Sequence, residues 1–223
     1  MLKLGILASG NGTNAQAIID KARAGLIGGE VRLVCTNNPR AGVLERAKKA
    51  GITSIVLQPG DFTDRESYDR ALVKVFLACN IEAVLLAGYM LLLSQNFLDA
   101  FPGPVLNIHP ALLPSFPGLH GISDTLDYGE KIGGVSVHFV DEKMDHGPLV
   151  IQAALGIDEY MGYDEFAGKI HALEHRIYPQ AVQWLCEGRL TREGRKVRLA
   201  KSGRPLAPQP QNALIWPPLE EGF

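Results

Sequence analysis

The sequence has little cysteine, no excess of either charge and no long apolar run. Its three cysteines, Cys35, Cys79 and Cys186, are too few and too widely spaced for a disulfide framework or a paired-cysteine metal site. The longest apolar stretch, residues 83–93, is about half of the ~20 residues that a membrane-spanning helix needs. Met1 leads directly into a strand pattern, without the apolar centre of a signal peptide. These absences predict a cytoplasmic protein without a membrane partner.

Charge and composition exclude two further classes of protein. The 22 basic and 24 acidic residues give a formal net charge of −2, whereas a nucleic-acid-binding domain is expected to have a pI above about 9. With 46% hydrophobic and 7% aromatic residues, the chain is also unlike a disordered protein. A length of 223 residues fits one domain, or one domain plus a short extension. We therefore expect a globular protein without a nucleic-acid partner.

Short apolar runs alternate with amphipathic segments through the first two-thirds of the chain. The strand-like runs cover residues 2–8, 31–36, 52–57, 83–87 and 105–108. Helical spacing of apolar residues covers 15–26, 43–47 and 63–79, and the third helix opens on a capping box of Thr63 and Glu66. Strands that are apolar almost throughout are typical of a parallel sheet covered on both faces. The pattern predicts an α/β fold with a mostly parallel, doubly wound sheet.

The last third of the chain departs from this alternation. Residues 135–140 and 149–155 form two strand-like runs, and the loop 141–148 between them is too short for a crossover helix, so they should pair as neighbours at one edge of the sheet. A long helix is expected at 163–187, kinked or broken at Pro179. Five of the 14 prolines fall within residues 205–218. The prediction is a domain at 1–190 followed by an extended or disordered, proline-rich extension at 191–223.

A glycine-rich turn, Ser9-Gly10-Asn11-Gly12-Thr13-Asn14, separates the first strand from the first helix. Two glycines let the backbone approach a ligand closely, and a helix start offers free N–H groups and a positive dipole end to a phosphate. The third glycine of the dinucleotide fingerprint is missing, and no Gly-Lys-Ser/Thr of a Walker loop is present. The turn is consistent with a site for one phosphate monoester, although an ordinary strand-to-helix turn favours the same residue types.

Asn107 and His109 lie at the end of the fifth strand, where period-two alternation puts both side chains on one face. The carboxyl end of a strand is where open α/β folds bind ligands. An amide beside an imidazole suits a reaction in which charge develops on a carbonyl oxygen, but a lone histidine at a strand end is more often structural. Asp145, in the loop 141–148, would favour the protonated imidazole if it faced His109. Spacing alone leaves open that Asp145 is a solvated turn residue.

Five motifs in this chain resemble those of a known family. They are Gly-Asn-Gly-Thr-Asn at 10–14, Asn-Ile-His-Pro-Ala-Leu-Leu-Pro at 107–114, Val-His-Phe-Val-Asp at 137–141, Asp-His-Gly-Pro at 145–148 and Glu-His-Arg-Ile-Tyr-Pro at 174–179. In order and spacing, residues 2–190 resemble the phosphoribosylglycinamide formyltransferases. The resemblance implies a Rossmann-like formyltransferase fold. It also implies transfer of the formyl group of 10-formyltetrahydrofolate to the glycinamide amine of phosphoribosylglycinamide, in de novo purine biosynthesis.

The resemblance also implies which residues form the site. The phosphate-binding half would be residues 1–104, and the catalytic and folate half residues 105–190. The catalytic residues would be Asn107, His109 and Asp145. The ribonucleotide would be bound by Gly12, Thr13, Asn14 and Glu174, and the folate by Arg65, Met90, Leu91, Leu92, Leu93, Asn107, Val140 and Asp141. No metal is expected, and the protein would be a monomer or a homodimer.

Three residues depart from the family pattern. Leu91 stands where many members carry a basic residue, Ser115 where some carry lysine, and Ile122 where some carry a second histidine. These departures concern substrate affinity rather than the type of reaction. His138 and His171 are expected to be structural residues.

Other functions remain open at this stage. A 10-formyltetrahydrofolate hydrolase would use water as acceptor, and such enzymes usually carry an additional N-terminal domain. A tRNA formyltransferase would need a further C-terminal domain, and a sugar-nucleotide formyltransferase would share the Asn-x-His motif and the later Asp. From other classes, the incomplete glycine fingerprint argues against a nicotinamide-dependent dehydrogenase. The Asn-x-His motif argues against a non-catalytic nucleotide-binding module.

Overall fold

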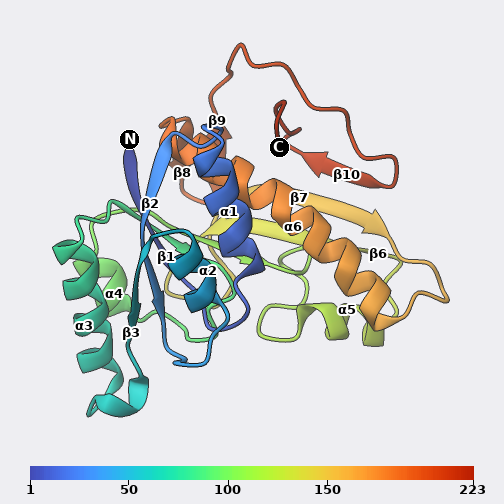
Figure 1. The fold of residues 1–223 in the computed structure, drawn as a ribbon. Coiled ribbons are helices and arrows are strands. Elements are labelled where there is room, and N and C mark those ends of the chain that lie inside the picture. The colour runs from blue at the N-terminus through green and yellow to red at the C-terminus, as the bar shows by residue number, and fades with distance from the viewer.

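An eight-stranded mixed sheet with helices on both faces forms the body of the molecule (Figure 1). The computed structural model describes residues 1–223. The strands are β1 (Leu2–Leu7), β2 (Gly29–Thr36), β3 (Thr53–Val56), β4 (Ala83–Leu86), β5 (Val105–His109), β6 (Ile132–Phe139), β7 (Leu149–Gly156), β8 (Leu190–Glu193), β9 (Lys196–Leu199) and β10 (Ala213–Trp216). The α-helices are α1 (Thr13–Arg23), α2 (Val43–Lys49), α3 (Arg65–Ala78), α4 (Gln95–Ala100), α5 (Gly121–Tyr128) and α6 (Tyr163–Cys186). None of these helices combines the length and the apolar character needed to cross a membrane.

The order of the strands determines where a ligand can bind. Across the sheet the order is β10-β7-β6-β5-β4-β1-β2-β3, with parallel pairing from β5 to β3 and antiparallel pairing from β5 to β10. The chain winds outward from β1 in one direction through β2 and β3, and in the other through β4 and β5. Such a reversal leaves a crevice at the carboxyl ends of the central strands. The predicted fold, a mostly parallel sheet with an antiparallel part, is confirmed.

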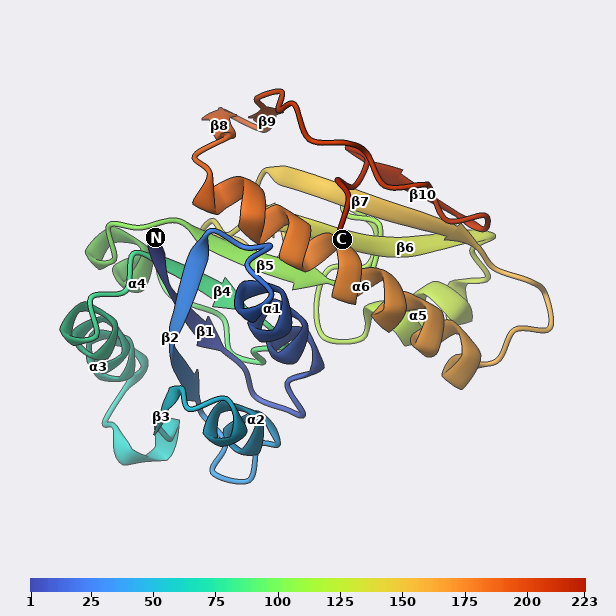
Figure 2. The same ribbon diagram turned by 45° about the horizontal axis from the view of Figure 1, so that its top comes forward.

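Two apolar cores lie on the two faces of the sheet. On one face α1, α2 and α6 pack over residues such as Ile6, and on the other α3 and α4 pack over residues such as Leu7 (Figure 2). Ile6 and Leu7 are adjacent in β1 and both are fully buried, as the period of two requires. Because both faces are covered, the central strands read as continuous apolar runs in the sequence.

The structure differs from the predicted cap of α3, and at Pro179, where a kink or a break was expected, it excludes the break. The capping box of α3 is formed one residue later, by Asp64 and Ser67: the Asp64 carboxylate accepts from the Ser67 N–H at 2.7 Å, and Ser67 Oγ accepts from the Asp64 N–H at 3.3 Å. Glu66 instead forms an ion pair with Arg70. Pro179 does not break α6, which continues from Tyr163 to Cys186. Buried side chains on both sides of the proline pack against the sheet and hold the helix together.

Of the two states expected for residues 191–223, extended or disordered, the structure shows the extended one. Strands β8 and β9 form an antiparallel hairpin, and β10 pairs antiparallel with β7 as the eighth strand of the sheet. The buried side chains of Ile215, Leu219 and Phe223 join the core beneath α6. The segment is extended, but it is anchored by apolar side chains between the prolines. Because β10 covers β7, the β6–β7 pair is not the outermost part of the sheet. The division of the chain near residue 190 stays a prediction.

Candidate active site

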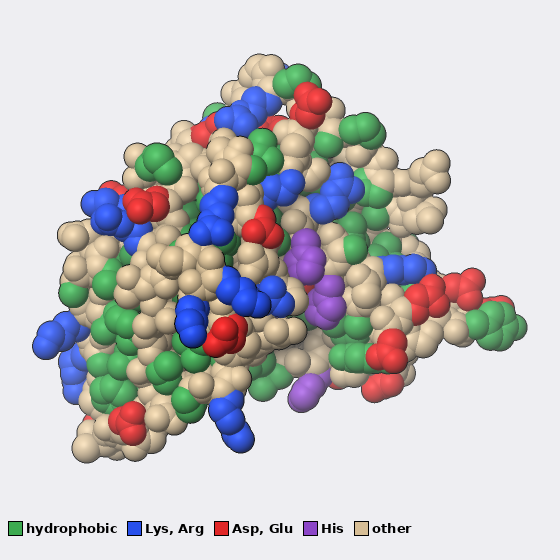
Figure 3. Space-filling view, in the orientation of Figure 1, with side chains coloured by type: hydrophobic (Ala, Val, Ile, Leu, Met, Phe, Trp, Pro, Cys, Tyr) green, Lys and Arg blue, Asp and Glu red, His purple; other side chains and the backbone are tan.

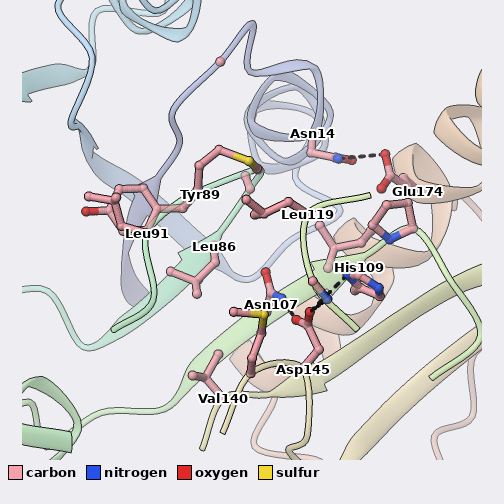
Figure 4. Close-up of a pocket in the computed structure, with 18 of the residues that line it drawn as sticks. Asn14, Leu86, Tyr89, Leu91, Asn107, His109, Leu119, Val140, Asp145 and Glu174 are labelled. Carbon is pink, nitrogen blue, oxygen red and sulfur yellow. Dashed lines mark hydrogen bonds and ion pairs between the residues drawn. The ribbon is translucent and has the colours of Figure 1, made fainter. Parts of the chain in front are cut away.

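A pocket of about 540 Å³ opens at the carboxyl ends of β1, β4 and β5. It lies where the strand order reverses, and its wall includes the first turn (residues 10–14), the segment 86–93 after β4, the end of β5, the β6–β7 loop and α6. Figure 4 shows Asn14 and Glu174 at one end of the pocket and Asp145 beside Asn107 and His109 away from that end. The fold therefore brings together motifs that are more than 100 residues apart in the sequence.

The first turn is shaped for close approach by a ligand. Gly12 has φ 75°, and a Cβ added there would lie 2.6 Å from Cγ2 of Val43, so both conformation and space require glycine. No side chain caps α1 at this end, and its first N–H groups have no partner within the helix. Arg46 Nε donates to the carbonyl oxygen of Asn11 at 2.7 Å, which places a guanidinium beside the turn. The turn thus offers N–H groups and positive charge to an anion.

Glu174 of α6 faces the first turn across the pocket. Its Oε2 accepts from Nδ2 of Asn14 at 3.0 Å and lies 2.9 Å from Nδ1 of His171 (Figure 4). The hydrogen bond and the negative charge of Glu174 raise the pKa of His171, against the effect of burial. The space-filling view shows histidine side chains gathered near α1 and α6, with lysine and arginine side chains beside them (Figure 3). The predicted neighbours Asn14 and Glu174 are in direct contact.

Asn107 and His109 both contact the carboxylate of Asp145, the first through a hydrogen bond and the second as an ion-pair contact. Asn107 Nδ2 donates to Oδ1 of Asp145 at 3.1 Å, and Nδ1 of His109 lies 3.4 Å from Oδ2 of the same carboxylate. Nε2 of His109 lies 2.7 Å from the carbonyl oxygen of Phe116. Both ring nitrogens of His109 therefore face oxygen atoms that can accept a hydrogen bond. The structure gives Asp145 the position facing His109 that spacing had left open.

Asp145 is held as a carboxylate by its surroundings. Burial alone would raise its pKa, but the neighbouring His138 ring, the charge of His109 and the N–H of Gly118 together lower the pKa of Asp145 below its ordinary value. Gly118 N donates to Oδ2 at 2.8 Å. The residue also has φ 49°, in the left-handed region that few non-glycine residues adopt. Its placement is thus fixed by several independent contacts.

Two pocket residues were expected to be structural. Nε2 of His138 lies 3.1 Å from Asn107 Nδ2 and 3.6 Å from Asp145 Oδ1. The sequence did indicate this position for His138. Val140, a predicted folate-binding residue, follows two residues later, and residues two apart in a strand lie on the same face. In the structure His138 also stands directly opposite Asn107 in the β5–β6 pairing. His171 is the second, and it lies three residues before Glu174, on the same side of α6. Both histidines line the pocket, and their structural role stays a prediction.

The residues expected on the folate side divide into two groups. Those that line the pocket are Met90, Leu91, Leu92, Leu93, Asn107 and Val140, joined by the apolar side chains of Leu86 and Tyr89. Arg65 and Asp141 are not part of its wall. The Arg65 guanidinium pairs with Asp69 at 3.2 Å, and the Asp141 carboxylate lies 2.8 Å from Nδ1 of His146. No group of three or more His, Cys, Asp and Glu side chains is arranged to hold a metal ion.

Comparison with known proteins places the chain in a class defined by this fold and site. Residues 2–182 match the family described as formyl transferase, and the chain belongs to this family. It is 42% identical over 185 residues to the phosphoribosylglycinamide formyltransferase of Escherichia coli (strain K12), covering 83% of this chain and 87% of that protein. The structure of glycinamide ribonucleotide transformylase 1 from Symbiobacterium toebii superposes with a TM-score of 0.88 at 43% identity, covering 90% of this chain and 95% of that one.

A third relative belongs to a longer protein. The chain is 41% identical over 188 residues to the trifunctional purine biosynthetic protein adenosine-3 of Drosophila melanogaster, covering 83% of this chain and 14% of that protein. Together these matches confirm the family that the five motifs predicted.

Proposed function

We propose that this protein transfers the formyl group of 10-formyltetrahydrofolate to the glycinamide amine of phosphoribosylglycinamide, giving phosphoribosyl-N-formylglycinamide and tetrahydrofolate in de novo purine biosynthesis. The observation that carries the proposal is that one pocket contains both an anion site at a helix start and the group of Asn107, His109 and Asp145. Relatives that cover most of the chain are named for this reaction.

Each end of the pocket suits one substrate. Gly12, Thr13 and Asn14 would hold the phosphate through backbone N–H groups, with Glu174 beside the ribose or glycinamide portion. The apolar wall of the segment 90–93 and Val140 would take the flat ring of the folate. Because Arg65 and Asp141 lie outside the pocket wall, they would contact only a part of the folate that extends beyond it.

The central group suits acyl transfer to an amine. As the amine nitrogen bonds to the formyl carbon, negative charge develops on the formyl oxygen, and Asn107 Nδ2 and protonated His109 are donors that can stabilise it. Both donors already have partners in the structure: Asn107 contacts Asp145 and His138, and His109 contacts the carbonyl oxygen of Phe116. The formyl oxygen must therefore replace one of these partners. The amine loses a proton and the departing N10 gains one. Asp145, through His109 or an ordered water, would support this transfer.

The test is an assay with each acceptor in turn. The protein is incubated with 10-formyltetrahydrofolate alone, with phosphoribosylglycinamide and with an amino-sugar nucleotide, and release of tetrahydrofolate is followed. We expect turnover only with phosphoribosylglycinamide. Turnover with water alone would show that the protein is a 10-formyltetrahydrofolate hydrolase. Turnover with the amino-sugar nucleotide would show that it is a sugar-nucleotide formyltransferase. The cytoplasmic location, the monomeric or homodimeric state and the absence of a metal remain predictions.

A further inference from the structure

The β8–β9 hairpin, which follows the residues matched to the family, contacts the loop that carries Asp145. Strand β9 lies beside β7 (Figure 2). Arg195, at the turn of the hairpin, donates from Nη1 to the backbone carbonyl oxygen of His146. The same Nη1 lies 3.1 Å and 3.3 Å from the two ring nitrogens of His146 and 4.0 Å from Oδ2 of Asp141. His146 directly follows Asp145, so the hairpin contacts the loop at the residue next to Asp145.

The ring of His146 connects the two charged side chains. Its Nδ1 lies 2.8 Å from Oδ2 of Asp141. Because a carboxylate only accepts hydrogen bonds, Nδ1 carries the hydrogen of this contact. Asp141, His146 and Arg195 therefore form one continuous chain of contacts along the outer side of the loop.

A second arginine of the hairpin holds the start of the loop. The guanidinium of Arg192 lies 4.9 Å from the ring centroid of Phe139, the last residue of β6. This is the geometry of a cation–π contact. Arg192 and Arg195 together bracket the loop, one where it leaves β6 and the other beside Asp145.

The backbone of the loop needs such support. Asp145 has φ 49°, and Gly147 packs so tightly that a Cβ there would lie 1.7 Å from the carbonyl oxygen of Phe139. A sparsely populated conformation of this kind persists only where surrounding contacts fix it. From inside the pocket, Asn107 and Gly118 hold the Asp145 carboxylate. From outside, the contact of Arg195 with His146 holds the adjoining peptide.

We propose that Arg195 is a positioning residue of the active site. It fixes the loop 141–148 from the outside, and the loop in turn keeps the Asp145 carboxylate against His109 and Asn107. The effect on catalysis rests on the proposed function, but the effect on the loop does not. Arg195 touches no substrate in this proposal and acts only through the loop.

A matched pair of variants tests the role in catalysis. Arg195→Ala removes the contact with the loop, whereas Arg198→Ala removes an arginine of the same hairpin that pairs with Glu193 at 2.7 Å. We expect Arg195→Ala to lower kcat about fivefold, the upper range for a partly exposed charged contact. The KM for phosphoribosylglycinamide should not change, since the first turn lies at the other end of the pocket. Arg195→Lys should recover part of the loss. Equal kcat in the Arg195→Ala and Arg198→Ala variants would overturn the proposal.

Hydrogen exchange tests the loop without any substrate. The backbone amides of residues 143–147 should exchange faster in Arg195→Ala than in the wild type and in Arg198→Ala, while the amides of β5 keep their protection. If the wild type shows no formyl transfer, the proposed function fails and this measurement alone decides the role of Arg195. Unchanged exchange in residues 143–147 would overturn it. Faster exchange of the β5 amides as well would also overturn the proposal, because it would mean that the substitution destabilises the whole fold.

Discussion

Asn107 and His109 present the only amide and imidazole pair at the end of β5, and both contact one carboxylate. Removing one donor to a developing oxyanion typically costs about 3–4 kcal/mol of transition-state stabilisation. We therefore predict that Asn107→Ala and His109→Ala each lower kcat by roughly a hundredfold or more. Steady-state kinetics on variants whose circular dichroism matches the wild type would measure this. Wild-type turnover in either folded variant would contradict the assignment.

The lowered pKa of Asp145 predicts a pH dependence of stability. Because its pKa is lower in the folded state than in the unfolded state, the group stabilises the fold fully above the ordinary aspartate pKa of about 4. This contribution is lost as the pH falls through the folded-state value. The free-energy difference between the wild type and Asp145→Asn should therefore be largest near neutral pH and shrink below about pH 4.

Urea unfolding of both proteins between pH 3 and pH 7 measures this difference. Asp158→Asn is a suitable control, since Asp158 accepts only from a nearby exposed N–H in the loop before α6. A difference that stays constant across this range would show that Asp145 is not the stabilising carboxylate.

At the residue scale, sequence reasoning found polar side chains at the ends of strands but not their long-range partners. Asn107 and His109 follow from strand alternation. The position of Asp145 depends on how the β6–β7 loop folds back onto β5, which no local pattern encodes. Arg65 is a second example. The sequence predicted that it lies at the start of a helix, but only the structure shows that its guanidinium forms an ion pair with Asp69.

At the scale of elements, the turn between β1 and α1 depends on one glycine. Gly12→Ala would put a Cβ against Val43 in a left-handed conformation, which costs about 1–2 kcal/mol from the conformation alone. We predict a lower melting temperature and a higher KM for phosphoribosylglycinamide. Gly10→Ala is the matched control, because nothing lies within 4 Å of a Cβ at Gly10. Equal effects of the two substitutions on KM would contradict the special role of Gly12.

Elements with a strong apolar period were predictable, and short ones were not. The central strands and α6 follow directly from the sequence, because burial on both faces or along one helix face leaves a long pattern. Strand β10 has only four residues, Ala213–Trp216, between proline-rich segments. Its pairing with β7 depends on tertiary contacts of Ile215 rather than on local propensity. The cap of α3 was displaced by one residue, because Asp64 is as good a cap as Thr63.

At the scale of the whole molecule, β10 ties the end of the chain to the main core. Ile215 is fully buried there, whereas its neighbour Leu214 is 65% exposed. We predict that Ile215→Ala lowers the free energy of unfolding by about 2–5 kcal/mol, and that Leu214→Ala changes it by no more than about 0.5 kcal/mol. Chemical denaturation of both variants measures this. Similar values for the two would mean that β10 adds nothing to the stability of the domain.

The pairing of β10 with β7 also bears on self-association of the protein. Without β10, the eight-residue strand β7, largely apolar, would present a row of unpaired backbone groups at the side of the sheet. Such an edge is a template for adding strands from other molecules and is a common origin of aggregates. With β10 in place, the sheet ends at both sides in a strand of four residues, β3 and β10. The proline-rich segment therefore covers a strand edge that would otherwise favour the addition of strands from other molecules.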